Sequence, residues 1–427
     1  MAADICPDAR PNWYKATMNT IHNKTCRMCT GTKFKVVIDL KHHPLVNSLV
    51  SKSGLGNKDL TFPLVVKQCE KCSLVQLVDL IDAEEIYRKV DYLYFSSDMP
   101  GLDKYFQPYA AEVRRRFLKD GDLVVEIGSN DGIMLKMFQA QNRVLGVDPS
   151  TNVALRALKR GIPTVPVFFS ESLAHKIAHE WGKAKVVIGN NCIAHLNDVR
   201  DLVRGVKALL AADGTFIVEC NYWGGMVKNT NYSLIYHDHY SYFSLKAWQS
   251  FAPKFGLRVF DAVVTPAQGG SLRLFICTDR RPETKRLKTL QLEEKETALN
   301  TYASSLRYRD NVLAQAQALR RTVLDLKKAG KSIAGYGAAA KGMTILKCSG
   351  IGAKILDYFV DDSPAKQGWF SPVDHIPIIS RQAAQKRLPD YFIILAPNYA
   401  EVIISKEKAF MRQGGRFIVP KNGITII

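Results

Sequence analysis

The sequence predicts an α/β protein in which a small metal-binding module precedes two units built from parallel strands and helices. Two Cys-x-x-Cys pairs lie near the N-terminus, and a buried strand followed by a glycine turn and a helix occurs twice, at 123–138 and 332–341. A chain of 427 residues also exceeds one ordinary hydrophobic core. We therefore expect two or three domains.

The composition is that of a folded soluble protein, with 47% hydrophobic and 23% charged residues. No segment approaches the roughly 18 uninterrupted apolar residues of a membrane span. The first residues, Met-Ala-Ala-Asp-Ile-Cys-Pro, lack a basic region followed by an apolar stretch, so no secretory signal is predicted. The expected location is cytoplasmic, with no membrane partner.

The formal net charge of +19 favours an anionic ligand, because a positive surface attracts phosphates. The basic residues are dispersed, with short clusters at 114–116 and 280–281, and the chain has no RNA-binding aromatic signature. Nucleic acid is therefore not the favoured partner. A host with a lysine-rich proteome explains the same excess without any functional meaning.

Four cysteines in two Cys-x-x-Cys pairs predict a structural zinc site, because each pair clamps one edge of a tetrahedral ion. Disulfides are the alternative in an oxidising compartment, and a redox motif would normally occur once. The long segment between the pairs is expected to carry its own hairpin or loop. It holds His42 and His43, which could each replace a cysteine as a ligand, although four thiolates already complete the coordination of the zinc ion. The expected ligands are Cys26, Cys29, Cys69 and Cys72.

A glycine turn at 128–132 predicts a cofactor site. Leu123–Ile127 is an apolar run typical of a buried parallel strand, and a helical pattern follows the turn. The next predicted strand ends in Asp148, where a carboxylate can bind both hydroxyls of a ribose. The loop lacks the three-glycine dinucleotide pattern and a phosphate-binding Gly-Lys-Ser/Thr. Asn130 and Asp131 instead favour S-adenosylmethionine, with Gly128 and Asn191, the last residue of a later strand, at the same site.

The run from Tyr236 to Ser244 contains two histidines, one carboxylate and three phenols within its first seven positions. Imidazole is the side chain that most readily accepts a proton near neutral pH. On a regular strand Tyr236 and His239 would lie on opposite faces, so we expect a loop or bulge. The alternative is an aromatic-rich strand end whose histidines are satisfied by neighbours. His195 either lines the cofactor site or is a buried structural histidine.

The C-terminal part predicts a connecting helix and a second nucleotide-binding type of fold. Residues 281–329 have helical spacing, with an apolar face at Val312, Ala316, Leu319, Val323 and Leu326. The second strand, glycine turn and helix follow, with further strands expected at 356–361 and 391–396. Its glycine loop could hold a pyrophosphate, with Lys341 as the charge partner. The alternative is a degenerate fold kept for packing.

The chain resembles the sugar C-methyltransferases, which act on nucleotide-linked 4-keto-deoxysugars, over almost its whole length. The resemblance implies a zinc-binding module at 1–85, a class I S-adenosylmethionine-dependent methyltransferase Rossmann-like domain at 86–280, a connecting helix at 281–329 and a second Rossmann-like domain at 330–427. Seven motifs carry the resemblance, at 26–29, 69–77, 92–97, 126–132, 236–244, 269–273 and 335–342.

The resemblance also implies roles for individual residues. His239 would be the general base, Tyr236 and Asp238 would position it or the substrate, and Tyr94 would border the sugar. Two features depart from the family pattern. Asp238 stands where the family usually has Glu, and Leu395–Asn398 lacks the tryptophan common before that asparagine.

The expected reaction is methylation of a carbon next to the keto group, at C-3, through an enolate formed by His239. A phenol of Tyr236 or Tyr94 would stabilise the enolate oxygen, since a carbon acid is too weak to lose its proton otherwise. The expected partner is a nucleotide-linked sugar, and the chain is expected to be a monomer or homodimer. Two other readings remain: an O- or N-methyltransferase of a related anionic molecule, and a zinc-containing nucleic-acid-binding protein.

Overall fold

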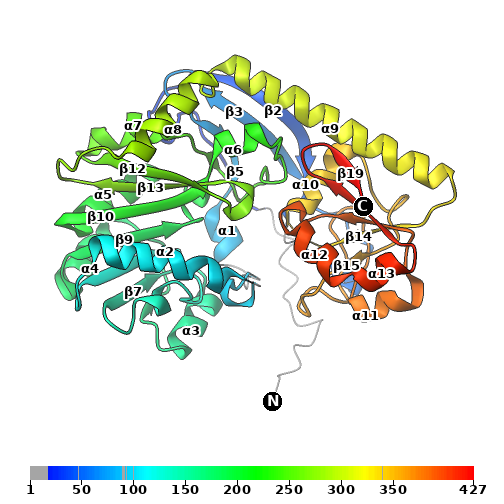
Figure 1. Cartoon of the computed structure of the whole chain (residues 1–427), viewed down its shortest axis with the longest axis horizontal. Helices are drawn as coiled ribbons and strands as arrows, with labels where there is room; N and C mark the ends of the chain where they lie inside the picture. The colour runs from blue at the N-terminus through cyan, green and yellow to red at the C-terminus, as the bar shows by residue number, and fades with distance from the viewer. Residues whose placement is uncertain (1–17, 47, 89–91, 93, 100, 339) are drawn as a thin grey trace.

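The computed structural model describes residues 18–427 apart from 47, 89–91, 93, 100 and 339. The first part of the predicted zinc module, Leu93 of the 92–97 motif and Ala339 of the 335–342 motif therefore lie outside the described residues. Two lobes, each built around a mostly parallel sheet, lie on either side of the molecule, and a long helix runs along both of them (Figure 1).

The N-terminal module consists of two small antiparallel sheets. The predicted hairpin between the cysteine pairs is present as β2 and β3. The four-stranded sheet has the order β11-β4-β3-β2, and its edge strand β11 comes from the segment directly after His239. The elements are β1 (Thr20–His22), β2 (Phe34–His43), β3 (Phe62–Cys69), β4 (Val75–Leu77), β5 (Asp79–Ile81), α1 (Ala83–Tyr87) and β11 (Ser241–Tyr242).

A seven-stranded sheet forms the core of the next lobe, in the order β12-β13-β10-β9-β6-β7-β8. The five strands from β10 to β8 are parallel, and β13 is antiparallel between β10 and β12. The strands are β6 (Leu123–Ile127), β7 (Arg143–Val147), β8 (Thr164–Val165), β9 (Ala184–Asn190), β10 (Leu210–Asn221), β12 (Arg258–Thr265) and β13 (Ser271–Cys277).

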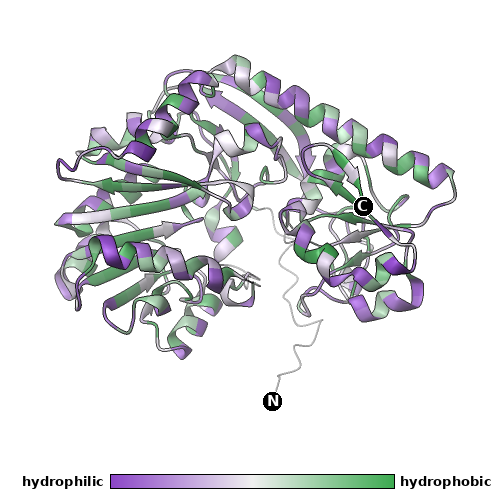
Figure 2. Cartoon of the chain, in the orientation of Figure 1, coloured by the Kyte–Doolittle hydropathy of each residue, from purple (hydrophilic) through white to green (hydrophobic). Residues whose placement is uncertain are grey.

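The helices of this lobe cover both faces of the sheet (Figure 1). Helix α5 shows why they form: the Asp198 carboxylate caps its first turn, and its apolar face, which includes Leu202 and Val206, is buried. In Figure 2 the strands are mostly hydrophobic, whereas the helices carry hydrophilic faces. The helices are α2 (Leu102–Phe117), α3 (Thr151–Lys159), α4 (Glu171–Trp181), α5 (Val199–Leu209), α6 (Trp223–Lys228) and α7 (Leu245–Phe251).

The strand order places the ligand site of this lobe between β6 and β9. The chain leaves β6 towards β7 and β8 on one side, whereas β9 continues to β10 on the other. At such a reversal the loops after the two strands diverge and leave a crevice at their carboxyl ends. The 128–132 turn follows β6 and Asn191 follows β9, so both predicted cofactor segments lie at this crevice.

The second lobe has a six-stranded sheet in the order β16-β15-β14-β17-β18-β19, parallel except for β19. Its reversal lies between β14 and β17, so the second glycine turn and residues 396–399 share one end of the sheet. The elements are β14 (Ile333–Tyr336), α10 (Ala340–Ser349), β15 (Phe359–Val360), β16 (Ile378–Ile379), α11 (Arg381–Ala384), β17 (Tyr391–Ile394), α12 (Ala400–Lys406), α13 (Lys408–Arg412), β18 (Arg416–Pro420) and β19 (Ile424–Ile426).

The predicted single connecting helix is instead two helices, α8 (Lys285–Glu296) and α9 (Tyr302–Lys328). Ala298 adopts a positive φ of 50°, and the Leu299 amide donates to the Glu294 carbonyl, which closes α8 with a Schellman-type turn. The Thr301 side chain then caps α9. The predicted apolar face of α9 packs into the core. Among the helices of the described residues, none is long and apolar enough to cross a bilayer.

Candidate active site

The glycine turn after β6 brings the backbone close to its neighbours. Gly128 has a φ of +66°, and a Cβ placed on it would lie 2.5 Å from Cβ of Cys192. Its amide donates to the Val147 carbonyl at 2.8 Å, which ties the turn to the end of β7. Only glycine fits both the conformation and the contact, as expected for a loop that must approach a ligand.

Asp148 lies at the end of β7 and binds the glycine turn. Its carboxylate accepts hydrogen bonds from the amides of Asn130 and Ser150, each at 2.9 Å. Burial raises the pKa of Asp148. A carboxylate can accept about four hydrogen bonds, so this group has capacity left for the two hydroxyls of a ribose.

The Asn130 side chain binds the segment at 94–98 rather than pointing away from the protein. Its oxygen accepts from the Ser96 amide at 2.7 Å, and its nitrogen donates to the Tyr94 carbonyl at 3.0 Å. The backbone of Asn130 is in the left-handed region, with a φ of 49°. This residue therefore joins the glycine turn to the predicted substrate-bordering segment.

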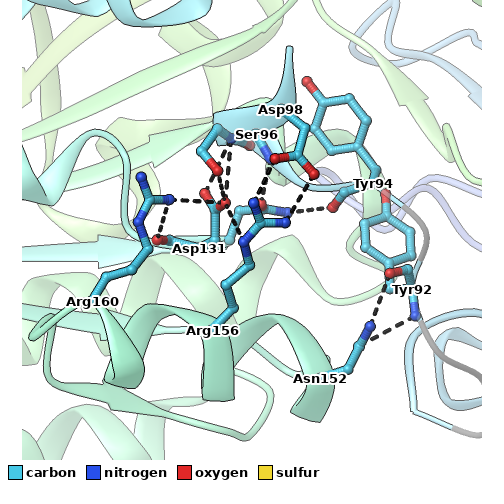
Figure 3. A network of polar contacts seen from close by, with 10 residues as sticks. Tyr92, Tyr94, Ser96, Asp98, Asp131, Asn152, Arg156 and Arg160 are labelled. Carbon is cyan, nitrogen blue, oxygen red and sulfur yellow. Dashed lines mark hydrogen bonds and ion pairs between the residues drawn. The ribbon is translucent and has the colours of Figure 1, made fainter. Parts of the chain in front are cut away.

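Asp131 is fully buried and lies between two arginines of the neighbouring helix (Figure 3). Its carboxylate lies 3.1 Å from Nη1 of Arg160 and 3.6 Å from Nε of Arg156. It also accepts from the amide and the hydroxyl of Ser97. This carboxylate therefore fixes the 96–98 turn against α3, while its predicted contact with the cofactor stays a prediction.

Unpartnered polar atoms mark the crevice between β6 and β9. Glu126 Oε2 and Asn191 Oδ1 are buried and have no hydrogen-bond partner within the described part of the chain. Glu126 Oε1 accepts from Asn190 at 3.3 Å. Buried acceptors are normally satisfied, so these two fit a ligand that brings donors, as S-adenosylmethionine does with its ammonium and hydroxyl groups. Glu126 was not predicted as a site residue, although its place at the end of β6 was a usable signal.

The run from Tyr236 to Tyr240 is irregular, and only Ser241 and Tyr242 form a strand. This agrees with the expected loop. The turn brings the Tyr236 hydroxyl to 2.9 Å from Nε2 of His239, with ring centroids 4.0 Å apart. A straight strand would have separated these two groups.

His239 is held with one ring nitrogen facing a carbonyl. Nδ1 lies 2.7 Å from the Leu234 carbonyl and 3.0 Å from the Asn221 amide. The shorter contact is to a carbonyl, which only accepts, so Nδ1 carries the hydrogen and Nε2 holds the lone pair; the Asn221 nitrogen, itself a donor, then makes no hydrogen bond to Nδ1. Burial, and then the neighbouring His195, lower the pKa of His239 well below its usual value. The ring is therefore a neutral imidazole with its basic nitrogen towards Tyr236.

Asp238 does not orient His239 through a side-chain bond among the described residues; the Leu234 carbonyl does so instead. Its carboxyl is buried, and burial raises the pKa of Asp238 to about 7. The Asp238 backbone carbonyl lies 2.6 Å from Nδ1 of His195, whose ring centroid lies 5.0 Å from that of His239. His195 is therefore buried beside His239, and its contacts fit both alternatives left by the sequence.

Tyr94 comes from the segment held by Asn130, and its phenol makes no hydrogen bond to His239 within the described residues. Burial, and then Tyr399 of the C-terminal lobe, raise the pKa of Tyr94 to about 12. Two further phenols lie near this cluster, Tyr87 and Tyr92, and only Tyr87 lies outside the motifs singled out in the sequence. The Tyr87 hydroxyl lies 2.9 Å from Nδ1 of His195, and the Tyr87 and Tyr92 rings lie 5.2 Å apart. Only Tyr92 carried a signal, from its position in the 92–97 motif.

The four predicted cysteine ligands converge. Their sulfurs lie within 4.8 Å of one another and are buried. The Cys26–Cys72 and Cys29–Cys69 sulfur pairs are 3.6 and 3.5 Å apart. A tetrahedral zinc site with Zn–S bonds of about 2.3 Å needs sulfurs about 3.8 Å apart, so the donor set fits zinc. Neither His42 nor His43 joins this group.

The glycine turn of the C-terminal lobe faces the methyltransferase lobe. The Lys341 ammonium donates to the side-chain oxygen of Gln268, which has a φ of 54° in the loop before β13. Burial lowers the pKa of Lys341 to about 8. The Asn398 side chain also approaches this loop. A Cβ atom added to Gly269 would lie only 2.7 Å from Oδ1 of Asn398. Cationic and amide groups therefore meet where the two lobes touch.

Comparison with known proteins agrees with this architecture. Residues 26–87 match the "Putative zinc binding domain" family, residues 102–262 match a methyltransferase domain, and residues 266–421 match the C-methyltransferase C-terminal domain. The protein is thus a methyltransferase whose N-terminal domain belongs to a zinc-binding family.

The particular family follows from a relative that spans nearly the same length. The chain is 36% identical over 402 residues to the C-methyltransferase NovU of Streptomyces niveus, covering 92% of this chain and 94% of that protein. The chain belongs to the C-methyltransferase family, which confirms the resemblance drawn from the seven motifs.

Two solved structures show weaker similarity, limited to part of the chain. The magnesium protoporphyrin IX methyltransferase ChlM of Synechocystis PCC 6803 is 14% identical, covering 42% of this chain and 80% of that one, with a TM-score of 0.32. The plantazolicin methyltransferase BpumL is 12% identical, covering 41% and 82%, with a TM-score of 0.34.

Proposed function

We propose that this enzyme methylates a carbon next to the keto group of a nucleotide-linked 4-keto-deoxysugar, at C-3. The observation that carries the proposal is the buried neutral His239, with Nδ1 against a carbonyl and Nε2 beside a phenol. A carbon next to a ketone loses its proton only to a base whose surroundings also stabilise the oxygen on which charge develops. This pair of side chains supplies both groups.

In this mechanism Nε2 of His239 takes the proton from the substrate carbon. A substrate carbon placed at Nε2 replaces the Tyr236 hydrogen bond, and the phenol is then free to donate to the enolate oxygen. S-adenosylmethionine supplies the methyl group, to which the enolate carbon bonds as the carbon–sulfur bond breaks. The proton remains on His239, whose imidazolium returns it to solvent after the product leaves.

The nucleotide end of the substrate is proposed to lie at the C-terminal lobe. Lys341 is a cation without a carboxylate partner among the described residues, at the glycine turn after β14. A phosphate group binds favourably to a partly buried ammonium and to the backbone of a glycine turn. The amide side chains of Gln268 and Asn398 line the same junction.

A deuterium-exchange experiment tests the base. The protein is incubated in deuterated water with NDP-4-keto sugars, without S-adenosylmethionine, and exchange next to the ketone is followed by NMR. We expect incorporation with the wild-type protein and with His175→Ala, an exposed histidine of α4. His239→Ala should abolish it.

Two outcomes would replace the proposal. Absence of exchange with every 4-keto sugar, together with methyl transfer to a hydroxyl or an amine, would identify an O- or N-methyltransferase. A strongly salt-dependent affinity for RNA or DNA without methyl transfer would point to the nucleic-acid-binding alternative, because counterion release dominates such binding.

A further inference from the structure

The segment that leaves the catalytic histidine is a strand of the zinc module. β11 pairs antiparallel with β4, with Ser241 opposite Gln76 and Tyr242 opposite Val75. The Leu77 amide also donates to the Tyr240 carbonyl at 2.9 Å. The residue directly after His239 is therefore bonded to a sheet whose neighbouring loops carry the zinc ligands.

Arg27 adds a side-chain link between the metal site and the same carbonyl. It stands between Cys26 and Cys29 in the chain and is 5% exposed. Its Nη1 donates to the Tyr240 carbonyl at 3.1 Å and to Oε1 of Gln76 at 3.0 Å. Nε2 of Gln76 in turn donates to the Cys26 sulfur at 3.2 Å. A continuous path thus runs from a metal ligand through two side chains to the catalytic loop.

The charge of Arg27 points to the metal cluster as its counter-ion. Within the described residues no carboxylate bonds to its guanidinium, and Nε and Nη2 have no partner. A buried cation is costly without a nearby negative charge. Four thiolates around a divalent ion carry a net charge of about −2, so an occupied cysteine site provides that charge beside Arg27.

Tyr240, whose carbonyl accepts the Arg27 bond, is also fixed on its other sides. The Tyr240 amide donates to the Ala194 carbonyl at 2.7 Å, next to His195, and its hydroxyl donates to the Ile81 carbonyl at 2.7 Å. Tyr240 is thus held between the methyltransferase lobe and the zinc module. Because His239 is its chain neighbour, a displacement of Tyr240 moves the base. A misplacement of about 1 Å at a reacting group can cost about 100-fold in rate.

We propose that Arg27 and Gln76 are positioning residues for methyl transfer, which connect the zinc site to the backbone of the His239 loop. The metal then orders the catalytic loop as well as the N-terminal module. The inference rests on the proposed role of His239 as the base. Neither residue contacts the reacting atoms.

The test uses Arg27→Met and Gln76→Met in the full-length zinc-loaded protein, since methionine keeps side-chain length and removes the polar groups. The matched control is Gln68→Met. Gln68 is a buried glutamine of β3, in the same sheet, whose amide faces the carbonyls of Ser73 and Asn300 instead of the catalytic loop. Zinc content, S-adenosylmethionine affinity, kcat and KM are measured for each variant. The imidazole of His239 is followed by NMR with ¹⁵N-labelled histidine.

We expect Arg27→Met and Gln76→Met to keep one zinc per chain and unchanged cofactor affinity. Their kcat should fall about 10- to 100-fold with little change in KM, and the His239 signals should shift or broaden. Arg27→Lys, which retains the charge and one donor, should recover most of kcat and the wild-type signals. Gln68→Met should match the wild-type protein in kcat and in the His239 signals.

Wild-type kcat and unchanged His239 signals in Arg27→Met would overturn the proposal, as would an equal effect of Gln68→Met. If Arg27→Met loses its zinc, Gln76→Met decides: a zinc-loaded Gln76→Met protein with disturbed His239 signals supports the link, and one with normal signals and wild-type kcat refutes it. The NMR readout needs no substrate. A failure of His239 as the base, seen as normal exchange in His239→Ala, is therefore distinguishable from a failure of the link.

Discussion

The Tyr236 hydroxyl lies 2.9 Å from Nε2 of His239, three residues further along the same turn. The opposite nitrogen of the imidazole faces the Leu234 carbonyl, so the turn fixes both the tautomer and the direction of the lone pair. The short segment from Leu234 to His239 therefore contains the proposed base, the carbonyl that sets its tautomer and the proposed donor for the oxyanion.

Tyr236→Phe is expected to lower kcat about 10- to 1000-fold, because the removed hydroxyl is the proposed donor for the enolate oxygen. Steady-state kinetics with the 4-keto sugar and the deuterium-exchange rate both measure this loss. Cofactor affinity should not change. A variant with wild-type exchange would show that another phenol, such as Tyr94, stabilises the oxygen.

His239 should remain neutral as the pH is lowered, since burial holds its pKa well below the usual value of about 6.5. In ¹⁵N spectra its two ring nitrogens should keep the pattern of the Nδ1–H tautomer from pH 8 down to pH 5.5. Titration of His239 near pH 6.5 would contradict the buried neutral base.

Asp238→Asn should stabilise the protein above neutral pH. Burial raises the pKa of Asp238 to about 7, whereas an unfolded aspartate titrates near 3.9. The folded chain thus binds the proton of Asp238 more tightly than the unfolded chain does. The stability that this proton contributes is lost as the pH rises from about 4 through 7. The variant should gain up to about 2–4 kcal/mol relative to the wild-type protein between pH 5 and pH 8.

Calorimetric unfolding across this pH range measures the Asp238 effect. The control is Asp120→Asn, which removes an exposed carboxylate. If the free energies of unfolding of the wild-type protein and Asp238→Asn change equally with pH, the Asp238 carboxyl is solvated.

Gly128→Ala should destabilise the protein and weaken binding of S-adenosylmethionine at least about 10-fold. The new methyl group would meet both a φ of +66° and the Cys192 side chain at 2.5 Å. Gly121→Ala separates these effects, since Gly121 has a φ of +83° but open space around its Cβ position. It should cost about 1–2 kcal/mol and leave cofactor affinity unchanged. Thermal unfolding measures the stability of the two variants, and calorimetric titration measures their affinity for S-adenosylmethionine. Equal losses of affinity in Gly128→Ala and Gly121→Ala would exclude the steric explanation.

Lys341→Gln should raise the KM for the nucleotide-linked sugar more than it lowers kcat, because it removes a cation proposed to bind phosphate. Burial lowers the pKa of Lys341 to about 8. The wild-type kcat/KM should therefore fall as the pH rises through 8, where the free amine loses its charge. The variant should lack this decline, and an unchanged pH profile would remove Lys341 from the phosphate site.

Features encoded by neighbouring residues could be predicted from the sequence. The cysteine spacing and the two strand–glycine–helix units depend on local chemistry. A regular strand would place Tyr236 and His239 on opposite faces, so the sequence already indicated a loop there. The break between α8 and α9 was missed because a positive φ at Ala298 is uncommon for a residue with a Cβ. It is stabilised by the capping bonds around it rather than by Ala298 itself.

The roles of some side chains depend on contacts between distant segments. Asn130 and Asp131 stay predicted cofactor residues, and their side chains also hold the 94–98 segment, about 35 positions away in the chain, which the sequence did not indicate. Asn221 lies beside His239 because β10 ends at the same edge of the sheet. No single-sequence pattern encodes such meetings, since they require the strand order to be known.

The placement of β11 in the sheet of the zinc module limits how such enzymes can be recombined. A chimera that exchanges the first part of the chain up to β5 for that of a relative would leave Ser241 and Tyr242 facing a foreign β4. Exchanges that keep both partners of this pairing from one parent should fold and remain active far more often than exchanges cut between them. The module and the catalytic loop therefore form one packing unit, although more than 150 residues separate β5 from β11 in the chain.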